Sequence, residues 1–395
     1  MPARISSIYL DYNATAPVIP EVLRAMQPYF SEVFGNSVSA AHSHGWDASE
    51  AVENARKKVA EFLSCESSEI YFTSGATESN NWCLRGLVDR WRKEQPGSPI
   101  HILASPLEHG SVTQVLKYLA DYQQVEFDLL PVDSYGRVLV EEIPKLIRPS
   151  TKLICISWVQ NEIGTVQPIA QIARLAETFQ VGVLSDATQA LGKVDIRMSE
   201  LPVDYLSFSA HKLGGPKGVG FLFIRKSATK PVPLFYGGGH ERGLRSATVN
   251  VPGVVGLGAC AQWWLQNGRH EREKSQHLMN FFWEKLSSEF PGIHLNGSPL
   301  GPDRSPVNLN ISFRGYRVPA SIPGLSVSKS SACNSGVGTA SYALKVIGVS
   351  DADADRTLRF SIGPGTSFDE LVATLQILKR HISSQKADFD LKSVD

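Results

Sequence analysis

Short β-rich runs alternate with amphipathic helical stretches through the first two-thirds of the chain, and this alternation limits the possible folds more than any other feature. We expect seven strands, at Ile70–Thr73, Ile100–Ala104, Val125–Leu130, Leu153–Trp158, Val181–Ser185, Tyr205–Ser209 and Val219–Ile224. Apolar residues three and four positions apart predict helices at Ala48–Leu63, Thr77–Lys93, Ser111–Tyr122 and Ile169–Thr178. The pattern predicts an α/β domain with a mostly parallel seven-stranded sheet between helices.

The last third of the chain has a different pattern. Its expected elements are a long helix at about Val254–Phe290, strands near Ile293–Leu295 and Val307–Phe313, and a final helix at Phe368–Ser383. Ser367 with Glu370 three residues later is a capping box, which marks the start of that last helix. We therefore expect a large α/β domain over residues 16–260 and a smaller α+β domain that combines residues 1–15 with 261–395.

Charge and cysteine content exclude several classes of protein. The 39 basic and 39 acidic residues cancel, so no charge excess indicates binding to nucleic acid or to an anionic membrane. The longest apolar runs, such as Val251–Cys260, contain glycine and are too short to span a bilayer. The first residues lack the apolar core of a signal peptide. The five cysteines are scattered and form no CxxC pair, so we expect a cytoplasmic protein without disulfides or a metal site.

Lys212 lies in the segment FSAHKLGGPKGVG, directly after the apolar strand expected at Tyr205–Phe208. Most lysines are solvated surface charges, and we expect this of nearly every other lysine in the chain. Lys212 differs because a buried type of strand precedes it and a glycine-rich turn follows it. Such a position can remove water from the amine and make it nucleophilic.

Asp186 ends the apolar run VGVLSDATQ, twenty-six residues before Lys212. A carboxylate at the tip of a buried strand is unfavourable unless a partner binds it. A protonated pyridine nitrogen would be such a partner. The alternative is that Asp186 caps a helix that begins with Ala187-Thr188-Gln189, and this segment alone leaves both interpretations open.

An anion site is expected in FTSGATESNN, at residues 72–81. A strand stops at Ser74-Gly75 and a helix begins near Thr77, so free N–H groups and the positive helix end would face an anion, with Ser74 and Thr77 as hydroxyl donors. Open α/β sheets bind ligands at the ends of their strands. A lysine, a carboxylate and a phosphate site at strand ends are together what a pyridoxal-phosphate enzyme requires.

The chain resembles the cysteine desulfurases, which belong to the class-V aminotransferase-like group of fold-type I pyridoxal-phosphate enzymes. The resemblance covers nearly the whole chain, in segments that follow one order: YLDYNATAP, FGNSVSAAHSHG, SGATESNN, LEHGSV, QNEIGTVQPI, DATQALGKVDI, SAHKLGGPKGVG, GGGHERGLRSAT, SACNSG and LRFSIG. It implies pyridoxal 5'-phosphate as cofactor, L-cysteine as substrate and a homodimer. It also implies a sulfur-acceptor or scaffold protein that serves iron–sulfur cluster or thio-cofactor assembly.

The resemblance assigns roles around the cofactor ring. Lys212 would bind the cofactor as a Schiff base and move protons, and Asp186 would face the pyridine nitrogen. Gln189 would contact the phenolic oxygen of the ring. His109, in LEHGSV, would stack on the ring and assist proton transfer. The alternative for His109 is that it caps the helix that follows.

The remaining roles concern the phosphate and the substrate. The residues expected to hold the phosphate are Ala76, Thr77, Ser209 and His211, with Thr248 reaching the phosphate of the other subunit across the dimer interface. Asn161, which would also contact the cofactor, and Arg359 would bind the substrate carboxylate, a task that suits the planar guanidinium group. The alternatives are that Asn161 holds a loop and that Arg359 is a surface charge at a strand edge.

Cys333 is the residue that selects the reaction. It lies in SVSKSSACNSGVGTASYAL, a composition typical of an exposed, mobile loop. We expect three of the other cysteines to be small buried apolar side chains (Cys83, Cys155 and Cys260) and Cys65 to have no specific role. A thiolate at Cys333, favoured by Lys329 or a nearby charge, would attack the substrate sulfur and leave alanine and an enzyme persulfide. The alternative is an unreactive surface cysteine.

The chain departs from the family pattern at three places. Ser330 and Ala247 stand where relatives usually have glycine, and the segment RGYRVPASIPGLSV is shortened, with Pro319 and Pro323 opposing the helix expected there. Two other functions remain open: a selenocysteine or cystine lyase that does not require Cys333, and a non-catalytic scaffold that retains the fold.

Overall fold

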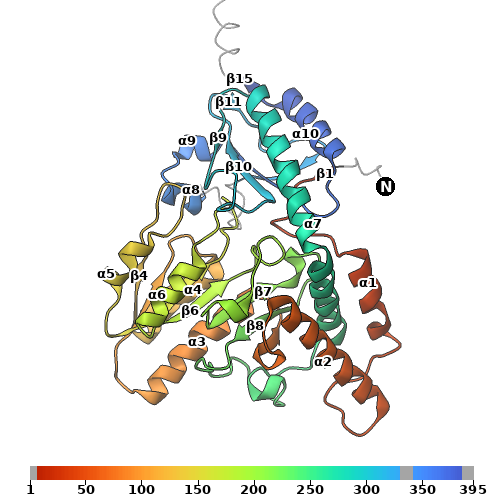
Figure 1. The fold of residues 1–395 in the computed structure, drawn as a ribbon, viewed down its shortest axis with the longest axis vertical. Helices are drawn as coiled ribbons and strands as arrows, with labels where there is room; N and C mark the ends of the chain where they lie inside the picture. The colour runs from red at the N-terminus through yellow and green to blue at the C-terminus, as the bar shows by residue number, and fades with distance from the viewer. Residues whose placement is uncertain (1–6, 330–340, 385–395) are drawn as a thin grey trace, which may run out of the picture.

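Helix α7 (Val251–Glu289) runs from the lower right of the molecule to its top and connects the two main sheets (Figure 1). The computed structural model describes residues 7–329 and 341–384. The first half of α7 packs in the core of the larger sheet, whereas its second half packs on the smaller sheet. The helix passes through residue 260, where the sequence predicts a domain boundary, and that boundary stays a prediction.

The larger sheet has seven strands in the order β2-β8-β7-β6-β5-β3-β4. Their bounds are β2 (Ile70–Thr73), β3 (Ile100–Ala104), β4 (Val125–Leu129), β5 (Thr151–Ser157), β6 (Gly182–Asp186), β7 (Tyr205–Ser209) and β8 (Gly220–Ile224). Only β8 runs antiparallel to its two neighbours. The predicted mostly parallel sheet is confirmed, and each strand lies within two residues of its expected bounds.

Helices cover both faces of this sheet because the side chains of each strand alternate between them. In β5, Leu153 and Cys155 join the core formed with α3 (Ala76–Glu94) and α4 (Gly110–Gln123). Ile154 and Ile156 join the opposite core, formed with α2 (Ser43–Leu63), α6 (Ile169–Thr178) and α7. Cys83, Cys155 and Cys260 are buried in these cores, as the sequence predicts.

Two helices differ from expectation near the N-terminus. The short helix α1 (Pro20–Met26) was not predicted. Helix α2 was expected to start at Ala48 but begins at Ser43, because the side chain of His42 caps it by accepting a hydrogen bond from the Gly45 N–H. A Cβ atom at Gly45 would overlap Ser39 O, so this turn admits only glycine.

The smaller sheet is antiparallel and has the order β13-β14-β10-β9. Its strands are β9 (His294–Leu295), β10 (Asn308–Ser312), β13 (Ser328–Lys329) and β14 (Thr357–Ser361), and it packs on α7 and α10 (Phe368–His381). The predicted capping box of Ser367 and Glu370 starts α10. Figure 1 shows this sheet and α10 together at the top of the molecule.

The N-terminal segment lies beside this smaller sheet, where Asp11 forms an isolated bridge with Ser361 of β14. Strand β1 (Ile8–Tyr9) pairs in parallel with β12 (Leu325–Ser326), and β11 (Tyr316–Arg317) pairs with β15 (Ser383–Ser384). The proline-containing segment thus forms short strands in its described part. Helices α8 (Tyr342–Val346) and α9 (Asp351–Ala354) complete this region. Across residues 7–329 and 341–384, no helix has the length and apolar character of a membrane span.

Candidate cofactor and active site

A cavity of about 440 Å³ lies at the carboxyl ends of β5, β6 and β7, where open α/β sheets bind ligands. Its lining includes ten of the residues that the sequence singles out: Ala76, Thr77, His109, Asn161, Asp186, Gln189, Ser209, His211, Lys212 and Arg359. Thr248 is exposed and lies outside this lining. Cys333 and Ser330 lie outside the described residues. Ser74, expected as a hydroxyl donor, is exposed and does not line the cavity.

Asp186 is the last residue of β6 and is buried. Its Oδ1 atom accepts a hydrogen bond from the Thr188 N–H, and its Oδ2 atom accepts one from Asn80 Nδ2, both at 2.9 Å. The residues after Asp186 form turns, so the interpretation of Asp186 as a helix cap is wrong. The carboxylate instead lies at the strand tip, facing the cavity, where a cationic ligand group can bind it.

His109 is positioned by the helix that it starts. Its Nδ1 atom accepts a hydrogen bond from the Ser111 N–H at 3.1 Å and lies 2.9 Å from Ser111 Oγ. His109 therefore caps α4, which was the alternative expected from the sequence. It also lines the cavity. Because Nδ1 accepts from the backbone, the proton of the neutral ring is on Nε2.

Lys212 ends a 3₁₀ turn, Ala210–Lys212, that follows β7. Its ammonium donates to the backbone oxygens of Asn13 and Ala14 at 2.7 and 2.6 Å. The N-terminal segment thus passes directly beside the amine. The neighbouring His211 contacts Thr15 through Nδ1 at 3.0 Å. Burial and the charges of Lys212 and other lysines lower the pKa of His211 to about 4, so its ring is neutral.

The anion cradle is the turn between β2 and α3. Gly75 precedes α3, and no side chain caps this helix. The Ala76 N–H donates to Ser209 Oγ at 2.7 Å, which joins the helix start to the end of β7. Gly75 has a φ of 150°, and a Cβ atom there would lie 3.0 Å from Ser209 Oγ, so glycine keeps the cradle open. First-turn N–H groups without helical partners suit a phosphate.

Glu78 holds this turn from outside the cavity. Its carboxylate accepts from the Ser74 N–H and from Arg245 Nε, both at 2.8 Å. Burial acts to raise the pKa of Glu78, but the hydrogen bonds from Arg245 and Ser74 outweigh it, so the pKa is lowered. The ion pair joins the cradle to the segment that leads to Thr248.

Arg359 is buried in β14, so its interpretation as a surface charge is wrong. One guanidinium nitrogen donates to Asp11 Oδ1 at 2.7 Å and to Ser328 Oγ at 2.8 Å. The other terminal nitrogen donates to Asn161 O at 3.1 Å. Asn161 therefore contributes a loop contact and also lines the cavity. Within the described part of the chain, Arg359 Nε has no hydrogen-bond partner.

Two buried carboxyl groups beside the cavity were not predicted from the sequence. Glu108 accepts from the Ser157 N–H at 2.6 Å and contacts Ser157 Oγ at 2.8 Å. Burial raises the pKa of Glu108 to about 8, despite these bonds, and the charge of Asp186 adds to the rise. Glu162 contacts Ser341, and burial also raises its pKa. Glu108 precedes His109 and Glu162 follows Asn161 in the sequence, but no local pattern predicts that either carboxyl group is buried.

Lys193 is a third residue that was not predicted, and it is an exception to the expectation that nearly every other lysine is solvated. Its side chain is buried, and Nζ donates to Gln189 Oε1 at 2.6 Å and to Asn13 Oδ1 at 3.4 Å. Gln189 in turn donates from Nε2 to Asn13 O at 2.9 Å. Asn13 thus accepts hydrogen bonds from two lysines and a glutamine beside the cavity.

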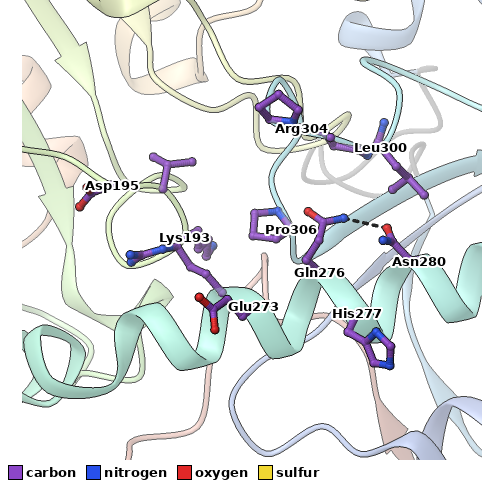
Figure 2. A pocket seen from close by; sticks show the side chains of 13 residues that line it. Lys193, Asp195, Glu273, Gln276, His277, Asn280, Leu300, Arg304 and Pro306 are labelled. Carbon is purple, nitrogen blue, oxygen red and sulfur yellow. Dashed lines mark hydrogen bonds between the residues drawn. The ribbon is translucent and has the colours of Figure 1, made fainter.

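A larger cavity of about 760 Å³ lies elsewhere, between α7 and the segment 300–306 (Figure 2). Its lining mixes the cations Arg272 and Arg304 with the anions Asp195 and Glu273. It contains no strand-end lysine and no helix N-terminus, so the smaller cavity is the candidate site. No cluster of metal-binding side chains occurs among the residues that the structure describes.

The smaller cavity fits pyridoxal phosphate. It has a helix N-terminus for the phosphate, the carboxylate of Asp186 for a protonated pyridine nitrogen, and the amine of Lys212 for the aldehyde. A glycine at position 75 leaves room at the phosphate end.

Comparisons with known proteins agree with this arrangement. Residues 8–373 match the family model for class-V aminotransferases. The chain is 38% identical over 368 residues to cysteine desulfurase IscS of Rickettsia typhi, covering 92% of this chain and 88% of that protein. The chain belongs to the cysteine desulfurase family of class-V aminotransferases. The predicted family and fold are thereby confirmed.

Other relatives of this family are equally similar. The mitosomal cysteine desulfurase of Trachipleistophora hominis is 39% identical, covering 92% of this chain and 83% of that protein. Among solved structures, a NifS-like protein matches with a TM-score of 0.85 and 34% identity, over 95% of this chain and 98% of that one. SspA in complex with cysteine matches with a TM-score of 0.79 and 34% identity, over 91% of this chain and 100% of that one.

Proposed function

We propose that the protein is a pyridoxal-phosphate-dependent cysteine desulfurase that converts L-cysteine to L-alanine and receives the sulfur on Cys333 as a persulfide. The observation that carries the proposal is the convergence of Lys212, Asp186 and the cradle at Ala76 on one cavity. Family membership supports it, because relatives are named cysteine desulfurases and one solved relative is a complex with cysteine.

The residues that would hold the cofactor each bind a different chemical group of it. Lys212 would bind the aldehyde carbon, Asp186 would keep a proton on the pyridine nitrogen, and the start of α3 with Ser209 would bind the phosphate. When bound, pyridoxal phosphate withdraws electrons from the Cα atom of an amino acid. Lys212 Nζ is then the base and acid that moves the proton at that carbon, and His109, whose Nδ1 accepts from the Ser111 N–H, can donate from Nε2.

Sulfur transfer requires a second nucleophile. The Cys333 thiolate attacks the sulfur of the substrate, so an S–S bond forms while the Cβ–S bond breaks. The electron pair of that bond stays on Cβ, which takes up the proton that the Cys333 thiol gave up and becomes the methyl group of alanine. Cysteine and a thiol thus give alanine and a persulfide, without an external oxidant or reductant.

Arg359 is our candidate for the substrate carboxylate. Its guanidinium lines the cavity, and Asp11, Ser328 and Asn161 fix its plane. Because these bonds hold the side chain before a ligand arrives, binding a carboxylate costs little side-chain entropy.

We also infer a homodimer, in which Thr248 reaches the cofactor of the partner subunit. Phe34 and Trp46 are large apolar side chains that are 64% and 58% exposed. Val38 is similarly exposed and lines the same surface cavity as residues 240–242 and Val249. Val38 thus lies beside the segment that leads to Val249, next to Thr248, and we place the interface between the two copies at this surface.

Two further parts of the proposal concern the cell. We place the protein in the cytoplasm, because Cys65, Cys83, Cys155 and Cys260 are free thiols. We assign the persulfide sulfur to an acceptor protein that serves iron–sulfur cluster or thio-cofactor assembly, since a persulfide transfers its outer sulfur to another thiol.

The test compares wild-type protein with Cys333→Ala, each supplied with pyridoxal phosphate and cysteine. The wild type should release alanine in step with sulfur, and its Cys333 peptide should gain the mass of one sulfur atom. The variant should keep the visible absorption of the bound cofactor but lose sulfur release. Release at the wild-type rate from the variant would indicate a lyase that does not use Cys333, and parallel assays with selenocysteine and cystine would identify its substrate. Protein that binds no cofactor would instead support the scaffold.

A further inference from the structure

Lys193 is buried at the boundary between the candidate site and the larger cavity. Its side chain is 7% exposed, and its ammonium points to Gln189 Oε1 and Asn13 Oδ1. It also belongs to the lining of the larger cavity, where Figure 2 labels it near Asp195 and Glu273. Both hydrogen-bond acceptors of the ammonium are neutral, so its charge is not balanced by an acid at this site. A buried ammonium in this state is unfavourable for folding and calls for a functional reason.

The contact with Lys193 determines which way the Gln189 amide points. An ammonium can only donate hydrogen bonds, so the atom that it contacts at 2.6 Å must be the amide oxygen. The amide nitrogen therefore faces the other way, and donates to Asn13 O at 2.9 Å. Because this nitrogen carries two hydrogens, one N–H remains for a ligand in the cavity that Gln189 lines.

The same cluster places two lysines close together. Lys212 and Lys193 both contact Asn13, the first through the backbone oxygen and the second through the side-chain oxygen. Burial and the charges of Lys212 and Arg359 lower the pKa of Lys193 to about 7. The two lysines therefore lie close enough that a positive charge on one repels a positive charge on the other.

We propose that Lys193 is a positioning residue, which aims an N–H of Gln189 at the anionic ring oxygen of the cofactor and places a positive charge behind Lys212. The inference rests on the proposed function, because it concerns pyridoxal phosphate in the same cavity. An N–H donor and a nearby cation both stabilise an anionic oxygen. The other charged groups around Lys193 are Arg359 on the side of the site, and Arg272, Glu273 and Asp195 on the side of the larger cavity.

The experiment measures cofactor binding and the visible absorption of the bound cofactor as a function of pH. In Lys193→Met the cation no longer opposes a proton on the lysine-bound cofactor, so the titration midpoint should rise. The affinity for pyridoxal phosphate should fall about tenfold, the effect of losing a hydrogen bond to a charged group. Lys193→Arg keeps a positive charge and a donor and should restore both readouts toward the wild type.

A matched control comes from the larger cavity. Gln276 lines its wall on α7 and bonds Asn280 at 2.8 Å (Figure 2), away from Gln189. Gln276→Ala should leave the midpoint and the affinity unchanged. If Lys193→Met does not fold, Lys193→Gln provides the test, because its amide still donates to Gln189 but carries no charge. That variant should raise the midpoint and keep most of the affinity.

The outcomes separate the two claims. A Lys193→Met protein that folds and shows the wild-type midpoint and affinity overturns the inference and leaves the proposed function intact. Wild-type protein that gives no visible absorption with pyridoxal phosphate overturns the proposed function, and the inference with it. An equal change in Gln276→Ala would assign the effect to the wall of the larger cavity rather than to Lys193, and would also overturn the inference.

Discussion

Asp186 receives a hydrogen bond from the side-chain amide of Asn80, whose Nδ2 atom lies 2.9 Å from Asp186 Oδ2. The same nitrogen donates to Ser111 Oγ at 2.9 Å, and Ser111 contacts His109. One buried amide on α3 thereby connects the carboxylate at the end of β6 with the histidine that starts α4. These are the two groups that we expect to face the nitrogen and the plane of the cofactor ring.

Asn80→Ala should reduce kcat about tenfold to a hundredfold with bound cofactor. It removes a hydrogen bond to a charged group, which contributes roughly 1.5–3 kcal/mol, and frees Ser111 and His109 from Asp186. Steady-state assays at saturating pyridoxal phosphate would measure the loss. Asn81→Ala is the control and should retain activity, because the bond of Asn81 within the described residues is to Thr77 O of its own helix. Equal activities for the two variants would show that the amide link is dispensable.

Arg359→Lys should raise KM for cysteine more than it lowers kcat. Lysine keeps the charge but loses the planar set of donors that Asp11, Ser328 and Asn161 hold in place. We expect an increase in KM of about tenfold or more, because a bidentate pair with a carboxylate becomes a single contact. Initial rates over a range of cysteine concentrations would measure it. An unchanged KM would mean that the substrate carboxylate binds elsewhere.

Glu108→Gln should change how stability depends on pH. The folded-state pKa of about 8 exceeds the ordinary value near 4.3, so the folded state binds a proton that the unfolded state releases between these values. The wild type should therefore lose stability as pH rises from about 4.5 to 8. Glutamine resembles the protonated acid and should remove this slope, with a relative gain on the order of 5 kcal/mol at pH 8.

Chemical denaturation of both proteins at several pH values would measure the effect. Glu126→Gln serves as control, because Glu126 is exposed and pairs with Arg148 at the surface. The same pH slope in wild type and Glu108→Gln would contradict the assignment of the proton to Glu108.

The sequence predicted the sheet well because its strands and helices carry strong periodic signals. The expected bounds of Ile70–Thr73, Ile100–Ala104, Tyr205–Ser209 and Ile169–Thr178 agree with the structure residue by residue. Residues that end such strands, or that lie in a strand–glycine–helix turn, could be assigned to one site because parallel strands place their ends together.

The residues that the sequence did not reveal depend on contacts between distant segments. Asn13 and Lys193 are separated by 180 positions and meet only in the folded chain. Their residue types are ordinary for a surface, and no local pattern marks their burial. Asn80 lies in the segment SGATESNN, but Ser111 and Asp186, which accept its hydrogen bonds, belong to other elements. The roles assigned to the ten cavity residues, and those of Thr248 and Cys333, stay predictions.

Arg56→Met should strongly destabilise the fold. Arg56 and Glu241 form a buried ion pair with two bonds of 2.8 Å, and Glu241 also accepts from the Phe72 N–H at 2.9 Å. The pair holds a strained turn, since Glu241 and Arg242 have φ values of 47° and 58°. Removal of the arginine leaves a buried carboxylate without its partner, which costs about 3–5 kcal/mol.

Urea unfolding would measure this loss in the free energy of unfolding. Arg24→Met is the matched control, because Arg24 pairs with Glu21 and both side chains are more than half exposed, so less than about 1 kcal/mol should be lost. Arg56→Met combined with Glu241→Gln should recover part of the stability, because the unpaired charge is then gone. If the double variant is no more stable than Arg56→Met alone, the loss comes from packing of the arginine side chain on Phe72 and not from the ion pair.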